Sequence, residues 1–362
     1  LRFPIKAWAG NDSVAMRFGR VEARVFETPA HQSIRLHQRT GEKSALKAGE
    51  QTLESPGTFA GWADVSSPDR GLAVSVRRFR ENFPKAFGYN PATATLDVDL
   101  WPEEQGPLDL STTEKALGPG AAARGSAFGL AKTHELLLYF HKGDPAETAE
   151  RMESFSRRLL IRNNPYWVDA TGSLGRLYPE DSRYQKEEKM LGDLFGWADR
   201  HPRYAGWYGM LDFGDTLTWW RDRDDDKQYG TFGWHPEGRW GWYNNEGAGT
   251  HSGSLLQFVR TGRWKYFEFG ENLARHIYDI DTVHYNTIAE DPRLRDVLND
   301  EFSQPGSMHR HNGDHWGGRN EEASHTNVFG ILLYYYLTGD ERAWEVSQEV
   351  GEFFLKERFT YT

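Results

Sequence analysis

The periodicity of the sequence changes near residue 145, and this change constrains the fold more than any other feature. Before it, short alternating or β-branched runs separated by Gly, Pro and Asn predict strands over residues 21–26, 71–79, 95–100 and 134–140. No long amphipathic helix lies between these runs, which favours an antiparallel sandwich over a doubly wound sheet. After residue 145 the apolar residues recur at helical spacing. The sequence therefore predicts a multidomain α+β protein, with an antiparallel β-sandwich over residues 1–144 followed by an α-helical domain over 145–362.

The helical part contains a weak internal repeat. Asp144 and Pro145 predict the start of a helix over 146–162, and further helices are predicted over 182–200, 250–261, 264–279, 325–338 and 341–356. Residues 255–262 match residues 332–339, and each copy is a helix that ends in Thr-Gly before a second helix. Stacked helical hairpins that close into a ring form an α/α toroid. We count about half of the helices of a six-hairpin ring, so we expect a toroid that is incomplete at its C-terminal end.

Composition excludes several classes of protein. The 362 residues carry 43 Lys+Arg against 53 Asp+Glu, a net charge of −10, and the longest basic run is residues 76–80, so we expect no nucleic-acid partner. No apolar stretch approaches about 18 residues, so we expect no membrane partner. The chain has no Cys, which excludes thiolate metal sites and Cys nucleophiles. It also has no phosphate-binding loop, nucleophile elbow or dinucleotide fingerprint.

The aromatic residues are unusually placed. They make up 14% of the chain, with 14 Trp, and many stand beside Gly and polar residues rather than among aliphatic ones. Flat rings flanked by hydrogen-bonding groups are typical of sugar-binding clefts, because a pyranose ring has apolar faces and a hydroxyl rim. The alternative is that these rings fill the ends of a large helical core.

The densest polar cluster lies in residues 306–325, just before a predicted helix. Its candidate functional residues are His309, Arg310, His311, His315, Trp316 and Arg319. Three interpretations stay open. The histidines with Asp314 can bind a divalent metal, although their spacing matches no standard zinc motif. They can anchor the loop by hydrogen bonds, or they can take part in catalysis or substrate binding.

A second polar cluster occupies the same place in the other copy of the repeat, so we expect both at one rim of the helical domain. It contains Tyr243, Asn244, Asn245, Glu246 and His251. The alternative is that Thr250 or Asn245 caps the following helix and Asn244 forms a turn. A third loop contributes Trp207, Tyr208, Asp212 and Asp215, whose carboxylates can equally be helix caps. The acidic run 221–227 is interpreted as a solvated loop, with a calcium site as the alternative.

Several segments resemble the exo-rhamnogalacturonan lyase family. Residues 71–86 (GLAVSVRRFRENFPKA), 100–102 (LWP) and 129–135 (GLAKTHE) resemble its central β-sandwich. Residues 242–246 (WYNNE) with His251, and 309–311 (HRH) with 315–316 (HW), resemble its α/α-toroid domain. The segments appear in the family's order, and the resemblance covers most of the chain. Because members carry a further β-domain before the sandwich and a longer toroid, we expect this chain to be an internal portion of such a protein.

The resemblance implies a polysaccharide lyase that degrades the rhamnogalacturonan backbone of pectin from a chain end by β-elimination at a uronic acid. That chemistry needs a neutralised carboxylate, a base at C5 and an acid for the leaving oxygen. Arg310, Arg319, Asn244 or Asn245 can bind the carboxylate and His251 or His311 can be the base, whereas Tyr243 or Tyr208 can be the acid. His309 and His315 can trade places with His311, and Lys132 or His134 can reach the cleft from the sandwich. The expected partner is an acidic polysaccharide or oligosaccharide.

Further expectations concern cofactors, location and rival functions. We expect no cofactor, with a divalent cation such as Ca²⁺ as the alternative, and a secreted or periplasmic location. One rival is an α/α-toroid glycoside hydrolase that uses Glu246 with Asp212 or Asp215. The other is a carbohydrate-binding protein without catalysis. Only a lyase creates a conjugated C4=C5 double bond, so the product distinguishes these functions.

Overall fold

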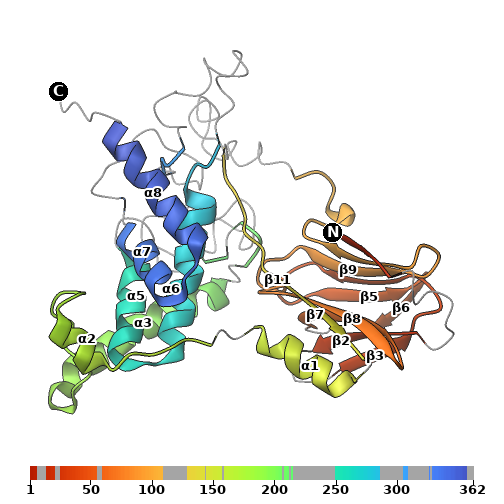
Figure 1. The fold of residues 1–362 in the computed structure, drawn as a ribbon, viewed down its shortest axis with the longest axis horizontal. Coiled ribbons are helices and arrows are strands. Elements are labelled where there is room, and N and C mark those ends of the chain that lie inside the picture. The colour runs from red at the N-terminus through yellow and green to blue at the C-terminus, as the bar shows by residue number, and fades with distance from the viewer. Residues whose placement is uncertain are drawn as a thin grey trace. The chain divides into compact units, whose positions relative to one another are not determined.

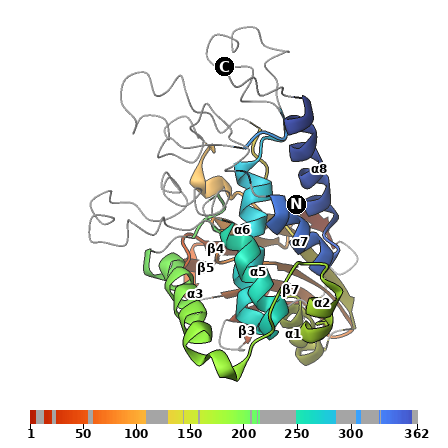
Figure 2. The same cartoon turned by 90° about the vertical axis from the view of Figure 1, so that its left-hand side faces the viewer.

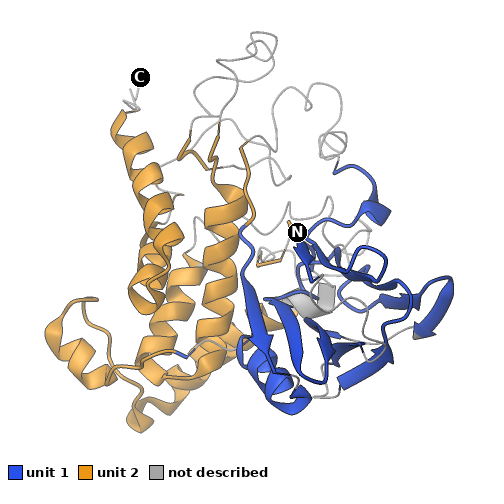
Figure 3. Cartoon of the chain, turned by 45° about the vertical axis from the view of Figure 1, so that its right-hand side comes forward, with its two compact units in different colours: residues 1–108, 133–159, 208–210 blue, residues 109–132, 160–207, 211–362 orange. Residues whose placement is uncertain are grey.

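The computed structural model describes residues 1–5, 14–20, 25–54, 59–108, 129–142, 144–156, 159–205, 208–211, 213–214, 249–285, 305–308, 326 and 328–356 (Figure 1). The described residues form a mixed α+β structure with two antiparallel sheets and seven α-helices. They fall into two compact units (Figure 3). The first unit contains residues 1–108, 133–159 and 208–210, and the second contains residues 109–132, 160–207 and 211–362.

The first unit contains both sheets, and every neighbouring pair of strands is antiparallel. One sheet has the order β1 (Arg2–Pro4), β10 (Thr95–Asp99), β9 (Lys85–Asn90), β4 (Ile34–Gln38), β5 (Ser44–Ala48) and β6 (Gln51–Glu54). The other has the order β11 (Leu136–His141), β8 (Arg70–Val76), β7 (Phe59–Ser67), β2 (Ala15–Arg20) and β3 (Val25–Pro29). A short 3₁₀ turn over Glu103–Gln105 follows β10.

The two sheets contribute to one hydrophobic core. Phe18 of β2 and Val74 of β8 belong to the same buried cluster as Leu36 of β4 and Phe87 of β9. Alternate residues of a strand point to opposite faces, so the next residues along β7 and β8 face away from this core. Helix α1 (Pro145–Ser154) covers part of that second face, where Met152 packs with Trp62 and Ala73.

Helix α1 begins as the sequence predicts but ends earlier. Asp144 caps it by accepting hydrogen bonds from the backbone N–H groups of Ala146 and Glu147, at 2.9 and 3.1 Å. The helix ends at Ser154 rather than Arg162, and the described residues from 159 to 164 are not helical. Because α1 packs on β8, it belongs to the first unit. The division between the units thus differs from the expected boundary between residues 144 and 145.

The second unit is helical. After α2 (Pro165–Thr171), a 3₁₀ turn over Ser182–Tyr184 leads into α3 (Gln185–Ala205). Two hairpins follow, α5 (Thr250–Thr261) with α6 (Trp264–His276), and α7 (Val328–Thr338) with α8 (Glu341–Lys356). Helix α5 contacts both α6 and α7 (Figure 2). The four helices share one apolar core that includes Leu255, Phe267, Tyr334 and Val346.

The predicted repeat is confirmed at the ends of α5 and α7. Gly262 and Gly339 have φ of +68° and +71°, the left-handed conformation that Gly adopts without strain, and each follows a Thr. The N–H of each Gly donates to a carbonyl four residues earlier, at 2.6 Å from Gly262 to Phe258 and 2.7 Å from Gly339 to Tyr335. The chain can then reverse into the second helix of each hairpin.

Candidate active-site support at the end of helix α6

The C-terminal end of α6 holds a buried group of ionisable residues. After His276 the helix widens into a single π-helical turn over Ile277–Asp281, a form of helix that is frequent at functional sites. His276, Asp279 and Asp281 are all buried. Thr282 closes this turn, since its hydroxyl donates to the carbonyl of Ile277 at 2.9 Å. Charged side chains are rarely buried this completely without a structural or catalytic role.

The histidine of this group is held in its neutral form. Its Nε2 lies 3.3 Å from Oδ1 of Asp281, and neither side chain is exposed to solvent. The pKa of His276 is lowered to about 3, mainly by burial and then by the nearby Lys132 ammonium, whereas a hydrogen bond with the backbone of Phe213 and the charge of Asp279 oppose the shift. Because a cationic imidazole is excluded, His276 serves here as a neutral hydrogen-bonding group.

Three segments that are distant in the sequence meet beside this turn. The N–H of Ala131 donates to the carbonyl of Asp279 at 3.0 Å, which brings Lys132 to the cluster. On the other side, Val283 exchanges backbone hydrogen bonds of 2.8 Å with Gly306 and Ser307. Gly129 lies so close to Tyr285 that a Cβ would stand 2.4 Å from its carbonyl oxygen. Residues 282–285 are thus held between segments 129–131 and 305–308.

The first turns of α5 and α7 lie against each other. His251 is buried in the first turn of α5, and a Cβ on Gly330 of α7 would stand 1.8 Å from its Cδ2. Gly214 also packs tightly on α6, where a Cβ would lie 2.8 Å from Cβ of His276. One end of the helical core contains the starts of α5 and α7 and the end of α6. The described residues that flank segments 215–248 and 309–325 therefore lie at this end. This is the end at which the sequence places its polar loops.

The alternative in which Thr250 caps helix α5 is wrong, whereas Asn245 lies outside the described residues. The N-cap is Gly249, in the left-handed conformation with φ of +65°, and it makes no side-chain cap hydrogen bond. Thr250 is the first residue of the helix rather than its cap. A glycine is suited to this position because the backbone conformation disfavours a residue with a Cβ.

The structure locates four of the predicted site residues. His251 is buried and Lys132 adjoins His276, both in the second unit. Tyr208 and His134 are half-buried and belong to the first unit, where the Tyr208 ring packs on Gly41. The other predicted residues lie outside the described part of the chain: Trp207, Asp212, Asp215, Tyr243, Asn244, Asn245, Glu246, His309, Arg310, His311, Asp314, His315, Trp316 and Arg319.

Sequence reasoning missed a second group of ionisable residues, which joins His284 to Arg342 and Glu349 of α8. Nδ1 of His284 lies 3.0 Å from Oε2 of Glu349 and 2.8 Å from Nη2 of Arg342. Burial raises the pKa of Glu349, but hydrogen bonds and charges from His284 and Arg342 outweigh it, so the pKa is lowered. The seven-residue spacing of Arg342 and Glu349 on one face of α8 was the signal available in the sequence.

No described helix has the length and apolar character needed to span a bilayer. In the same part of the chain, no group of three or more His, Asp or Glu side chains is arranged to hold a metal ion.

Comparison with known proteins gives one distant relative. No family model matches the chain. The chain is 25% identical to the uncharacterized protein YetA of Bacillus subtilis (strain 168) over an alignment of 297 residues, which covers 78% of the chain. The match covers 32% of YetA, so the chain spans about a third of the length of the curated relative it matches.

Proposed function

We propose that the protein is a polysaccharide lyase that cleaves a uronate-containing polysaccharide by β-elimination, with the rhamnogalacturonan backbone of pectin as substrate and exo action. The observation that carries the proposal is the packing of His251 against Gly330. It brings together the helix starts that follow two polar loops rich in His, Arg, Asn and Tyr. A shared rim is what these residue types need to act on one substrate.

The proposed reaction assigns a separate task to each residue type. Arg310 or Arg319, with Asn244 or Asn245, neutralises the uronate carboxylate, which makes the proton on C5 more acidic. His311 or His251 removes that proton as a neutral imidazole. Tyr243 donates a proton to the glycosidic oxygen on C4 as the C4–O bond breaks and the C4=C5 double bond forms.

The buried cluster at the end of α6 supports this assignment by fixing the start of a loop. His276 hydrogen-bonds with the backbone of Phe213, and Gly214 packs on α6. Residues held by packing and by hydrogen bonds from a second layer position catalytic groups more accurately than free loops do. We therefore assign His276 and Asp281 a positioning role.

The proposal includes the finer architecture. We propose that the two sheets, which share one hydrophobic core, form a β-sandwich, and that the α5–α6 and α7–α8 hairpins belong to an α/α toroid. A lyase of this kind meets its polymeric substrate outside the cytoplasm, so the proposed location is secreted or periplasmic.

A product assay tests the function. The protein is incubated with rhamnogalacturonan, pectin, ulvan and glucuronan, and ultraviolet absorbance and mass spectrometry record the products. We expect unsaturated uronate ends from rhamnogalacturonan, with short products accumulating from the start as exo action requires. Products with saturated ends only would show that a hydrolase is present. Binding without any product would leave the carbohydrate-binding alternative.

A further inference from the structure

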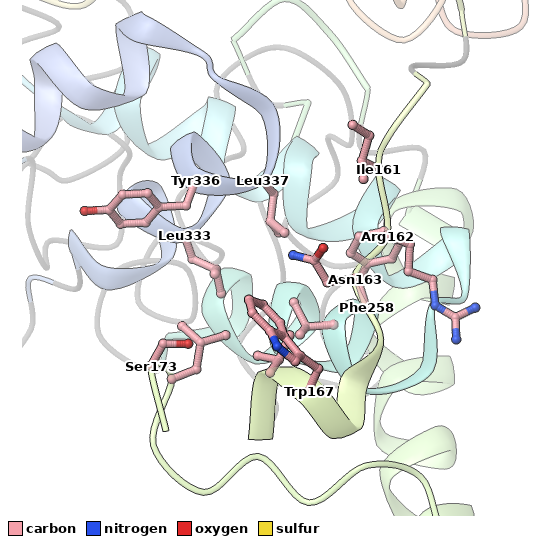
Figure 4. A pocket seen from close by; sticks show the side chains of 12 residues that line it. Ile161, Arg162, Asn163, Trp167, Ser173, Phe258, Leu333, Tyr336 and Leu337 are labelled. Atoms are coloured by element: carbon pink, nitrogen blue, oxygen red, sulfur yellow. The ribbon is translucent and has the colours of Figure 1, made fainter. Parts of the chain in front are cut away.

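A pocket lies at the other end of α5 and α7, away from His251 and Gly330. It encloses about 420 Å³ between α2, α5, α7 and residues 161–163 (Figure 4). Phe258 and Val259 of α5, Leu333 of α7 and Val168 of α2 form its buried floor. All of its lining residues belong to the second unit. The pocket is thus separate from the helix starts that carry the proposed active site.

The mouth of the pocket exposes aromatic rings. The Trp167 side chain extends over the pocket from α2, and 62% of this residue is exposed (Figure 4). Tyr336 of α7, on the opposite side, is 70% exposed. Trp, Tyr and Arg are enriched among the residues that carry most of the energy of binding interfaces, and an indole ring beside an apolar floor offers a flat surface on which a ligand can stack.

Polar groups surround the rings. Arg162, Asn163, Trp167 and Tyr336 each carry a side-chain donor, and no hydrogen bond or ion pair joins these groups to another described residue. In Figure 4 the amide of Asn163 lies between Leu337 and the Trp167 ring, while the guanidinium of Arg162 extends away from these side chains and packs on Gly262. The pocket therefore combines an apolar floor with unpaired hydrogen-bonding groups at its rim.

This combination identifies the chemistry of the occupant. An apolar helix of a partner protein would bury the Asn163 amide and the Trp167 indole N–H without partners, at a cost of about 1–3 kcal/mol for each group. A pyranose ring instead presents an apolar face to the indole and hydroxyl groups to the rim. One or two sugar rings also suit the volume, which lies within the range of small-molecule sites.

We infer that the pocket between α2, α5 and α7 is a second carbohydrate-binding site, which holds a pyranose ring of the polysaccharide by stacking on Trp167. The identity of the polysaccharide rests on the proposed function, whereas the pocket itself does not. A second site of this kind keeps a polymer on the protein between cleavage events, since two linked sites raise the effective concentration of the chain.

The experiment compares Trp167→Ala with Tyr166→Ala. Tyr166 is the neighbouring residue of α2, is 66% exposed and does not line the pocket, so it is a matched control. Calorimetric titration with rhamnogalacturonan oligosaccharides, and electrophoresis in gels that contain the polymer, measure binding. We expect Trp167→Ala to weaken binding at one class of sites about tenfold or more, and Tyr166→Ala to bind as the wild type does.

A second variant guards against a folding defect. Asn163→Leu removes the amide but keeps a side chain of similar size, and circular dichroism verifies that each variant is folded. We expect it to weaken the same class of sites several-fold. If both folded pocket variants bind oligosaccharide as tightly as the wild type, the second site is refuted. The same holds if Trp167→Ala abolishes only a concentration-dependent dimer in sedimentation, because the occupant would then be a second copy of the chain.

The failure of this proposal is distinguishable from that of the proposed function. If no unsaturated product forms but binding depends on Trp167, the lyase assignment fails and the second site stands. If unsaturated product forms and binding is independent of Trp167 and Asn163, the lyase stands and the second site fails. With both correct, Trp167→Ala slows cleavage of the polymer and leaves the rate on short oligosaccharides unchanged.

Discussion

The imidazole of His251 occupies the space that Gly330 leaves by having no side chain. A Cβ at residue 330 would stand 1.8 Å from Cδ2 and 2.2 Å from Nε2 of the ring. Both residues lie in the first turn of their helices, α5 and α7. The contact therefore fixes how closely two helix starts approach, and with them the described ends of two polar segments.

Gly330→Ala should destabilise the protein by roughly 1–3 kcal/mol, because the added methyl group overpacks the contact with His251. This loss should exceed the gain of about 1 kcal/mol that Ala brings to a helix interior. Urea unfolding gives the measurement. The control is Gly351→Ala on α8, where an added Cβ meets no atom within 4 Å, so that variant should be neutral or more stable. Equal effects of the two substitutions would contradict the packing argument.

His276→Gln should make stability less sensitive to acid. The folded-state pKa of His276 is about 3 against an ordinary 6.5, so below pH 6.5 the unfolded chain binds a proton that the folded protein does not. Stability contributed by this residue is present above pH 6.5 and is lost as the pH falls toward 3, at up to about 1.4 kcal/mol per pH unit. Urea unfolding between about pH 7 and pH 4 should give a shallower slope for the variant than for the wild type.

The control for this slope is His31→Gln, since His31 is exposed. We expect its pH dependence to match that of the wild type. If stability falls with pH at the same slope in the wild type and in His276→Gln, the imidazole binds its proton as readily in the folded protein as in the unfolded chain, and the argument from burial is contradicted. The test compares how the free energy of unfolding changes with pH. A loss of stability that is the same at every pH in His276→Gln therefore does not affect it.

Arg310→Ala and His311→Ala should each lower the rate of unsaturated product formation by about 10²-fold or more, because the first removes the carboxylate's counter-charge and the second removes a base. Initial rates of absorbance increase on rhamnogalacturonan measure this effect. Arg151→Ala on α1, where the side chain is exposed, should retain the wild-type rate. A His311→Ala variant as fast as the wild type would exclude His311 as the base and leave His251 as the candidate.

Asp144→Ala should destabilise the first unit by about 1 kcal/mol. Its carboxylate accepts hydrogen bonds from two backbone N–H groups at the start of α1, and alanine leaves them without that acceptor. The exposed Glu150 of the same helix makes no such bonds, so Glu150→Ala should change stability by no more than about 0.5 kcal/mol. Thermal unfolding of the two variants distinguishes a cap from a general effect of charge.

The sequence predicted elements whose signals are local. The bounds of α5 and α8 match the prediction, because apolar spacing and the Thr-Gly turn lie within the segments themselves. Strand β7 was missed, since its sequence FAGWADVSS has Val65 as its one β-branched residue, and its second face mixes Trp62 with Asp64 and Ser66. Asp64 is tolerated there because Arg17 and His141, both distant in the sequence, lie 3.2 and 2.8 Å from its carboxylate oxygens.

In the candidate site, too, some features are local to the sequence and others depend on contacts between distant segments. The residue types that are available, and the two polar loops that precede equivalent helices, can be read from the sequence. Three contacts can be read only from the folded chain: Lys132 adjoins His276, His251 packs on Gly330, and Trp167 stands over a pocket between α2, α5 and α7. Periodicity reports which face of an element is buried, because one element is enough to define it. Contacts between elements depend on how the chain packs, and no local pattern specifies that.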